Sequence, residues 1–344
     1  YVYNLSKGLI NEGHTVEVIT SNIPEGRTFE VMDGISVRRL RCIGEPLRNP
    51  LVPSIFLLIN ELKNFDIIHI HNVYSFVALS FPLLKRLCKV PLVLTHHGQL
   101  MFGEHIGDTC VRIYEKSARR VILNSVDRTV TLSKSDARHI AQYNGASEDH
   151  GISLPLRRVV TIPNGYDNTK FYPMNTGECR EALGLPTDKK VILNVGRLYG
   201  VVKGHEHLIN AMSRIVRERT DILCVVVGPG RLYDALKSQI GSLGLEDHVM
   251  LAGGKPHDEI PLWLNACDLF VLPSLSEGNP TVMFEAFGCG KPFVGTRVGG
   301  IPEVVTSDKY GLLVDPGNPD DLAEKTLIAL DREWDSEAIL AYSE

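Results

Sequence analysis

The sequence predicts an α/β protein built from two Rossmann-like domains, each with a doubly wound parallel sheet. Three observations support this fold class. Short apolar runs alternate with longer segments of helical pattern along the whole chain, as in parallel sheets covered by helices. The length of 344 residues suits two domains, each with its own core. A segment with Pro and Asn-Gly, residues 162–167, punctuates the chain near its middle.

The apolar runs predict the strands. In the first half we expect strands at residues 15–20, 35–40, 67–70, 91–95, 128–132 and 158–162. In the second half we expect strands at residues 191–195, 222–227, 249–252, 269–272 and 292–296. The punctuated segment then divides the chain into a first domain, residues 1–168, and a second domain, residues 169–344.

Composition is that of a globular protein, with 44% hydrophobic and 22% charged residues. Seven cysteines are scattered without the spacing of a metal or redox pair, which fits a reducing cytosol. No apolar run approaches the roughly 18 residues that span a bilayer, and the first residues lack the plan of a signal peptide. We therefore expect a cytoplasmic protein, and nothing in the sequence calls for a nucleic-acid partner.

Charge is distributed unevenly between the halves. Residues 1–172 carry 20 Lys and Arg against 16 Asp and Glu, whereas residues 173–344 carry 16 against 25. A basic first half suits an anionic acceptor or peripheral contact with the inner face of a membrane. An ordinary solvated surface explains the same charges and is the interpretation that we favour. The basic residues that cluster are Lys85, Arg86, Lys89, Arg112, Lys116, Arg119 and Arg120.

The most informative stretch runs from Glu277 to Glu285. An apolar strand precedes it, Asn279 is a preferred N-cap, and Pro280 suits the first position of a helix. A helix that begins at the carboxyl end of a parallel strand is an anion site, because its first N–H groups are unpaired. Since Pro280 prevents one continuous helix across both carboxylates, Glu277 and Glu285 are expected to hold different ends of one ligand.

A second group of residues suits phosphate. The strand expected at 191–195 is followed by Gly196 and Arg197, and Lys203 and Gly204 lie a short loop further on. Arg binds phosphate oxygens through two parallel hydrogen bonds and Lys as a compact charge. The alternative is a pair of surface cations beside a helix.

Together these motifs resemble the signature of retaining family 4 glycosyltransferases with the GT-B fold. The resemblance rests on the Glu-x7-Glu spacing from Glu277 to Glu285, on the Glu277-Gly278-x-Pro280 start and on the Gly-Lys-Pro of residues 290–292. It extends over nearly the whole chain, including residues 196–198 and 298–303. It implies two domains facing across a cleft, the first for the acceptor and the second for a nucleoside diphosphate sugar.

The resemblance also implies roles for single residues. Glu285 corresponds to the residue that binds the ribose hydroxyls, and Glu277 to the one near the transferred sugar. Arg197 and Lys203 would hold the diphosphate, although five residues separate them, one more than the resemblance leads us to expect. The further donor contacts are expected from Gly196, Gly253, Gly254, Lys255, Gly278, Asn279, Pro280, Thr281 and Val282.

In the first domain the resemblance assigns the active-site histidine to the position before Gly98, which is His97. A histidine can hydrogen-bond a sugar hydroxyl or stabilise developing charge. The alternatives are a histidine packed at a strand end, or a shift of register to His96. His69 and His71 alternate on one strand and are expected to be structural or to line the cleft.

No cofactor or metal is expected. No carboxylate or cysteine stands at a convincing ligand spacing from a histidine, so the charge of the leaving group falls to Arg197, Lys203 and the helix N-terminus. Residues 228–230, Gly-Pro-Gly, match part of a dinucleotide fingerprint, but the last glycine is missing and the match is weak.

The predicted function is therefore that of a retaining glycosyltransferase that transfers a sugar to a glycan, lipid-linked or small-molecule hydroxyl. The alternatives are a nucleotide-sugar-binding protein with impaired catalysis and a sugar-nucleotide epimerase or phosphorylase of the same fold. Residues 1–10 already read as an amphipathic helix, so the family's first strand and glycine-rich loop are expected to be missing. The family's final crossover helix is likewise expected to be cut near residues 341–344.

Overall fold

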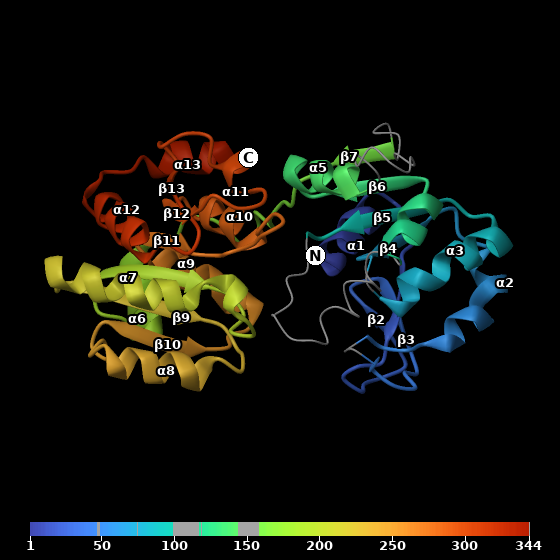
Figure 1. Ribbon diagram of the computed structural model, residues 1–344, viewed down its shortest axis with the longest axis horizontal. Helices are drawn as coiled ribbons and strands as arrows, with labels where there is room; N and C mark the ends of the chain where they lie inside the picture. Colours follow the sequence, from blue (N-terminus) through green and yellow to red (C-terminus); the bar gives the residue numbers. More distant parts are fainter. Residues whose placement is uncertain (47–48, 74, 99–116, 118, 144–157, 344) are drawn as a thin grey trace. The chain divides into compact units, whose positions relative to one another are not determined.

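The structure is a computed structural model that describes residues 1–46, 49–73, 75–98, 117, 119–143 and 158–343 (Figure 1). The chain divides into two compact α/β units. The first consists of the described residues up to 162, apart from Gly98 and residues 133–136, and the second contains residues 163 onward. The predicted fold class, two α/β domains with parallel sheets, is confirmed.

The first unit contains two sheets. One has the order β1-β3-β2, and the other has the order β4-β5-β6-β7 with every pair of neighbours parallel. The strands are β1 (Glu17–Ser21), β2 (Phe29–Met32), β3 (Ile35–Leu40), β4 (Ile68–His71), β5 (Leu92–His96), β6 (Arg128–Thr131) and β7 (Val159–Thr161). The helices in this part of the chain are α1 (Val2–Asn11), η2 (Pro53–Leu58), α2 (Ile59–Leu62), α3 (Phe76–Cys88) and α5 (Lys134–Tyr143).

One strand of the first unit departs from the expected pattern. Strand β2 was not predicted, and it pairs antiparallel with β3. The turn between them is Asp33-Gly34, and both residues have positive φ, 47° and 82°. This is the backbone that a two-residue hairpin needs, and Asp-Gly is a strong hairpin signal. The sequence therefore contained the signal for β2, although the strand itself is largely exposed and lacks a clear apolar pattern.

The second unit has a single sheet of parallel strands in the order β10-β9-β8-β11-β12-β13. Its strands are β8 (Lys190–Val195), β9 (Ile222–Val227), β10 (Val249–Gly253), β11 (Leu269–Leu272), β12 (Phe293–Thr296) and β13 (Gly311–Val314). Strand β13 was not predicted. Its helices are α6 (Thr176–Leu183), η4 (Val201–Lys203), α7 (His205–Glu218), α8 (Tyr233–Ser242), η5 (His257–Glu259), α9 (Ile260–Ala266), α10 (Thr281–Gly288), α11 (Ile301–Val304), α12 (Pro319–Asp331) and α13 (Ser336–Ser343).

Helices cover both faces of this sheet, which explains why its strands read as continuous apolar runs. In β8, Val191 and Leu193 belong to the core cluster that includes side chains of α9 and α10. Ile192, which points to the opposite face, belongs to the cluster that includes side chains of α7 and α12. Since the strands are parallel, the carboxyl ends of β8 and β11 open at the same edge of the sheet, where the candidate site lies.

Candidate functional site

Helix α10 follows the loop after β11, and it begins one residue later than predicted. Thr281 is its first residue and Pro280 is its N-cap, with an extended backbone and no side-chain cap. The predicted N-cap, Asn279, is therefore wrong. The Asn164 side chain contacts the start of the helix without capping it, since its Nδ2 donates to the Asn279 carbonyl at 2.6 Å and to Thr281 Oγ1 at 3.3 Å. Met283 donates its N–H to the Pro280 carbonyl at 3.1 Å, whereas the N–H groups of Thr281 and Val282 have no carbonyl within the helix to bond.

Glu277 is held just before this helix in a nearly buried position, with 8% of its side chain exposed. Its Oε1 accepts hydrogen bonds from Lys203 Nζ and from Ser274 Oγ, each at 2.7 Å. A buried carboxylate requires such partners, because removing its charge from water is costly. The structure thus brings together Glu277 and Lys203, which are 74 residues apart in the sequence.

Two backbone contacts explain how Lys203 reaches Glu277. Leu275 donates its N–H to the Val202 carbonyl at 2.7 Å, which joins the loop after β11 to the loop after β8. Gly204 has a φ of +68°, and a Cβ placed there would lie 1.9 Å from the Pro273 carbonyl oxygen. Only glycine fits this close approach, so Gly204 determines where Lys203 stands.

Gly196 and Arg197 follow β8 directly, as predicted. The Gly196 N–H donates to the Val227 carbonyl at 2.9 Å, which fixes the loop to β9. The side chain of Arg197 is exposed and has no ion pair with any residue in the described ranges. It is therefore available to an anion at the edge of the sheet.

Glu285 lies in the second turn of α10, with 8% of its side chain exposed. Its Oε1 is 3.1 Å from Nε2 of His257, at the start of η5. Neither His257 nor Ser274 was predicted from the sequence. Ser274 is three residues before Glu277, whereas His257 is 28 residues from Glu285 and gave no local signal.

Two predicted donor residues, Gly253 and Lys255, make contacts with residues other than Glu277 and Glu285. Gly253 ends β10 with a φ of +71°, and its carbonyl accepts from the Gly228 N–H at 2.9 Å. The Lys255 ammonium lies over the Trp263 ring, 5.4 Å from its centre. Among the predicted cations, Lys203 is the one that hydrogen-bonds a predicted carboxylate, that of Glu277.

The glycines at 299 and 300 hold the start of the motif. Gly300 donates its N–H to the Gly278 carbonyl at 2.7 Å. A Cβ at Gly299 would lie 1.7 Å from the Glu277 carbonyl oxygen, and the φ of this glycine is +53°. The loop after β12 is thus packed directly on Glu277 and Gly278.

His97 lies in the first unit, at the carboxyl end of β5. Its Nε2 is 3.1 Å from Nδ1 of His71, and His71 stacks on His69 with 4.4 Å between ring centres. Burial lowers the pKa of His97 to about 4 and the pKa of His71 to about 3. His97 is half-buried, whereas the alternative candidate, His96, is 1% exposed. His97 is thus the accessible member of the pair and can offer a neutral imidazole.

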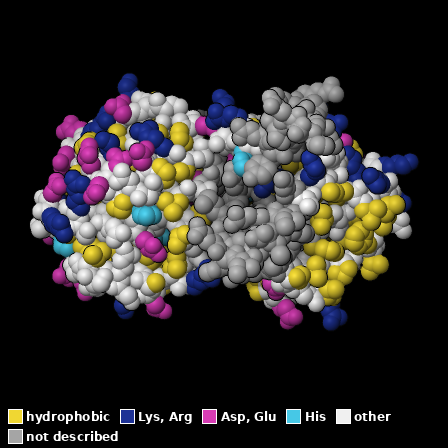
Figure 2. Space-filling view, in the orientation of Figure 1, with side chains coloured by type: hydrophobic (Ala, Val, Ile, Leu, Met, Phe, Trp, Pro, Cys, Tyr) yellow, Lys and Arg dark blue, Asp and Glu magenta, His cyan; other side chains and the backbone are white. Residues whose placement is uncertain are grey.

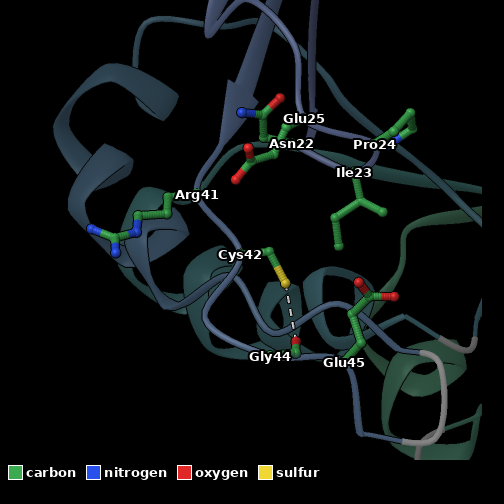
Figure 3. A pocket seen from close by; sticks show the side chains of 8 residues that line it. All are labelled: Asn22, Ile23, Pro24, Glu25, Arg41, Cys42, Gly44 and Glu45. Atoms are coloured by element: carbon green, nitrogen blue, oxygen red, sulfur yellow. Dashed lines mark hydrogen bonds between the residues drawn. The ribbon is translucent and has the colours of Figure 1, made fainter.

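The described residues include a pocket but no metal site. No group of three His, Cys, Asp or Glu residues in the described ranges is arranged to hold a metal ion. A pocket of about 500 Å³ in the first unit is lined by residues after β1 and β3 (Figure 3). Cys42 donates there to the Gly44 carbonyl at 3.0 Å, and Arg41 points away from Ile23 and Glu45 (Figure 3). None of the predicted site residues lines this pocket.

The close approach at Gly204 predicts a large effect of one methyl group. We expect Gly204→Ala to lower the free energy of unfolding by about 3 kcal/mol, because the methyl meets the Pro273 carbonyl and the backbone is strained. Urea denaturation measures this change. Gly244→Ala is the matched control, since Gly244 has a similar φ of +64° but open space around its Cβ. Equal losses for the two variants would contradict the packing argument.

The pKa of about 4 for His97 predicts that its ring stays neutral from pH 8 down to pH 5. NMR of the histidine Cε1–H groups, with His97 assigned through a His97→Gln variant, should show no titration of this signal in that range. The same signals in urea-unfolded protein should titrate near pH 6.5. A His97 midpoint above pH 6 in the folded protein would contradict the effect of burial.

Comparison with known proteins identifies the family. Residues 1–170 match the model of Glycosyltransferase Family 4, and residues 175–343 match that of Glycosyl transferases group 1. An uncharacterized glycosyltransferase of Methanocaldococcus jannaschii is 30% identical over 340 residues, which cover 93% of this chain and 81% of the relative. N-acetyl-alpha-D-glucosaminyl L-malate synthase of Bacillus anthracis is 25% identical over 336 residues, which cover 96% of this chain and 83% of that enzyme.

Solved structures share the fold. Sucrose-phosphate synthase from Thermosynechococcus elongatus has a TM-score of 0.75 at 20% identity. The match covers 100% of this chain and 86% of that protein. Anabaena HepE, solved in complex with UDP-glucose, has a TM-score of 0.68 at 22% identity, covering 90% of this chain and 85% of HepE. These likenesses show the GT-B fold. The chain is a glycosyltransferase enzyme and belongs to glycosyltransferase family 4.

Proposed function

We propose that this glycosyltransferase transfers a sugar from a nucleoside diphosphate sugar to an acceptor hydroxyl, with retention of the anomeric configuration. The observation that carries the proposal is the Lys203–Glu277 pair in front of the first turn of α10. A cation, a carboxylate and unpaired helix N–H groups at one place suit a ligand that joins phosphate to a hydroxyl-rich sugar.

Each end of the donor has candidate partners in the second unit. Arg197 and Lys203 would bind the diphosphate, Glu277 would accept from hydroxyls of the transferred sugar, and Glu285 would accept from the ribose. Ionised acceptors strengthen such hydrogen bonds. The remaining donor contacts are proposed for Gly196, Gly253, Lys255, Gly278, Asn279, Pro280, Thr281 and Val282. The structure of HepE with UDP-glucose is consistent with this class of donor.

Lys203 and Glu277 hold each other in position through their ion pair. In the present arrangement the ammonium compensates the buried carboxylate. When a diphosphate approaches, the same ammonium can contact a phosphate oxygen, because Lys has three N–H donors and one suffices for Glu277. The carboxylate thus holds the cation at the leaving group, and Lys203, Arg197 and the α10 N-terminus would stabilise the departing charge. We propose that the enzyme needs no metal for this step.

His97 is the residue of the first unit that we propose to hydrogen-bond a hydroxyl of the transferred sugar. Since Nε2 already contacts His71, Nδ1 is the atom left for the sugar, and in a neutral imidazole it donates or accepts according to the tautomer. The reaction that we propose uses no protein nucleophile: the acceptor oxygen bonds to the anomeric carbon on the face from which the diphosphate leaves, and the acceptor proton passes to the diphosphate. Retention is tested by NMR of the product, and an inverted anomeric centre would exclude this route.

Donor binding tests the proposal directly. We expect one of the UDP-, GDP- or ADP-sugars to bind with micromolar affinity in calorimetry, and Arg197→Ala and Glu277→Gln each to weaken it by roughly ten- to a hundredfold, the worth of a charge-assisted hydrogen bond. Arg217→Ala, which removes an exposed cation on α7, is the control and should bind normally.

The outcomes also separate the alternative functions. Absence of binding by a folded chain, or binding unaffected by both substitutions, would refute the donor site. Binding without transfer to any acceptor would favour a nucleotide-sugar-binding protein. Conversion of the free donor to another sugar nucleotide would favour an epimerase.

We further propose a cytoplasmic location with peripheral contact to anionic lipid through the first unit. No helix in the described ranges combines the length and apolarity needed to cross a bilayer. Apolar side chains gather on the surface of the first unit in the region of α2 and α3 (Figure 2). Among the exposed apolar residues, Leu57 belongs to η2 and Leu83 and Leu87 belong to α3, and their exposed fractions are 83%, 52% and 48%. Exposed Arg86 and Lys89 lie at the end of α3, as lipid contact requires.

Vesicle sedimentation tests this contact. We expect the protein to bind vesicles that contain phosphatidylglycerol but not pure phosphatidylcholine, and Leu57→Ser with Leu83→Ser to weaken binding several-fold through lost apolar burial. Ile328→Ser, an exposed apolar residue on α12, is the control. Equal binding by the double variant and the control would contradict the proposal.

Two of the basic residues predicted to cluster, Arg112 and Lys116, lie outside the described residues.

A further inference from the structure

The carboxylate of Glu285 is buried, whereas the imidazole bound to it is accessible. Oε1 of Glu285 lies 3.1 Å from Nε2 of His257. The side chain of Glu285 is 8% exposed and that of His257 is 56% exposed. His257 therefore stands at the edge of a buried carboxylate, where a ligand of Glu285 would also have to enter.

His257 is the one side chain in the described ranges that hydrogen-bonds or pairs with Glu285. A carboxylate offers about four acceptor positions, and this contact fills one of them. Oε2 of Glu285 has no side-chain partner in the described ranges and is not among the fully buried polar atoms, so it can be reached by a ligand. A pair of adjacent hydroxyl groups on a ligand would supply two donors.

The imidazole is itself held in place by its surroundings. The Phe171 ring meets it edge-on, with 5.4 Å between ring centres and an angle of 65° between the planes. Lys170 and Asp258, which adjoin Phe171 and His257 in the sequence, form an ion pair at 2.6 Å between Nζ and Oδ1 and so join the two segments. These contacts restrict the orientation of the imidazole, so that Nε2 stays directed at Glu285.

We propose that His257 is a positioning residue for ribose recognition: its Nε2–H holds Oε1 of Glu285, so that the other carboxylate oxygen accepts both vicinal hydroxyls of the nucleotide ribose. The inference rests on the proposed function, in which Glu285 contacts the ribose. It adds a second residue to that subsite and gives the enzyme a means to distinguish ribose from deoxyribose. A carboxylate free to rotate would lose part of this discrimination, because fixed geometry favours one hydroxyl pattern.

The charges around His257 add a dependence on pH. The hydrogen bond to Glu285 is the largest influence and raises the pKa of His257, and the charges of Glu285 and Asp258 raise it further. Burial and the charge of Lys170 lower it. Phe171, whose ring contacts the imidazole, carries no charge. The protonated imidazole makes a charge-assisted hydrogen bond, which becomes a weaker neutral one as the pH rises through this raised pKa. Ribose discrimination should therefore be stronger at pH 6 than at pH 8.5.

Calorimetry with matched nucleotides tests the inference. UDP and 2′-deoxy-UDP are the probes, and GDP or ADP with their 2′-deoxy forms replace them if one of these binds more tightly. We expect the wild-type chain to prefer the ribonucleotide by about tenfold, the worth of one hydrogen bond to a charged group. His257→Ala should reduce this preference to less than about threefold, and His257→Gln, which keeps an N–H donor, should retain most of it.

The ratio of the two affinities separates positioning from a structural effect. A general disturbance of the site would weaken both nucleotides equally and leave their ratio unchanged, which would overturn the inference. The pH dependence of the ratio should disappear in His257→Gln, and its persistence there would also overturn the inference. His207→Ala, on α7, serves as the control histidine.

Glu285→Gln distinguishes failure of the inference from failure of the proposed function. If no nucleoside diphosphate binds, or if Glu285→Gln leaves the ribose preference intact, the proposed ribose contact is refuted. If Glu285→Gln removes the preference and His257→Ala does not, the ribose contact stands and His257 has no positioning role.

Discussion

The candidate site depends on the close approach of two backbone segments at Gly204 and Pro273. A side chain at position 204 would collide with the Pro273 carbonyl, 1.9 Å away. Because this residue is glycine, the loop after β8 can pack on the loop after β11, and Lys203 then reaches Glu277 at 2.7 Å. Without this contact the two loops would not pack together, and Lys203 would not come within hydrogen-bond distance of Glu277.

Glycines at other loops along this edge of the sheet allow similarly close backbone contacts. A Cβ at Gly228 would lie 1.9 Å from the Gly196 carbonyl oxygen, and one at Gly230 would lie 2.3 Å from the Leu198 backbone. At Gly299 the obstacle is the Glu277 carbonyl oxygen. The glycines at 228 and 230, which match part of a dinucleotide fingerprint, thus serve loop packing. Glycine at these positions lets successive loops stack closely enough to form one surface.

The two carboxylates of the motif are buried alike but compensated differently. Glu277 is paired with an ammonium and Glu285 with an imidazole. An imidazole can change its charge near neutral pH, and the hydrogen bond to Glu285 raises the pKa of His257. The ribose end of the proposed donor would therefore respond to pH through His257.

The sequence by itself determined the fold class, most of the strands and the stretch that forms the site, because apolar periodicity and the Pro280 helix start are local signals. The N-cap of α10 and the partners of the two carboxylates were decided by tertiary structure. Asn279 has the preference of an N-cap, but Asn164 reaches the helix end from 115 residues away. His257 meets Glu285 only because the carboxyl end of β10 leads the chain to α10. The conformational preferences of single residues do not predict such pairings, because the pairings form only when parallel strands bring distant loops to one edge of a sheet.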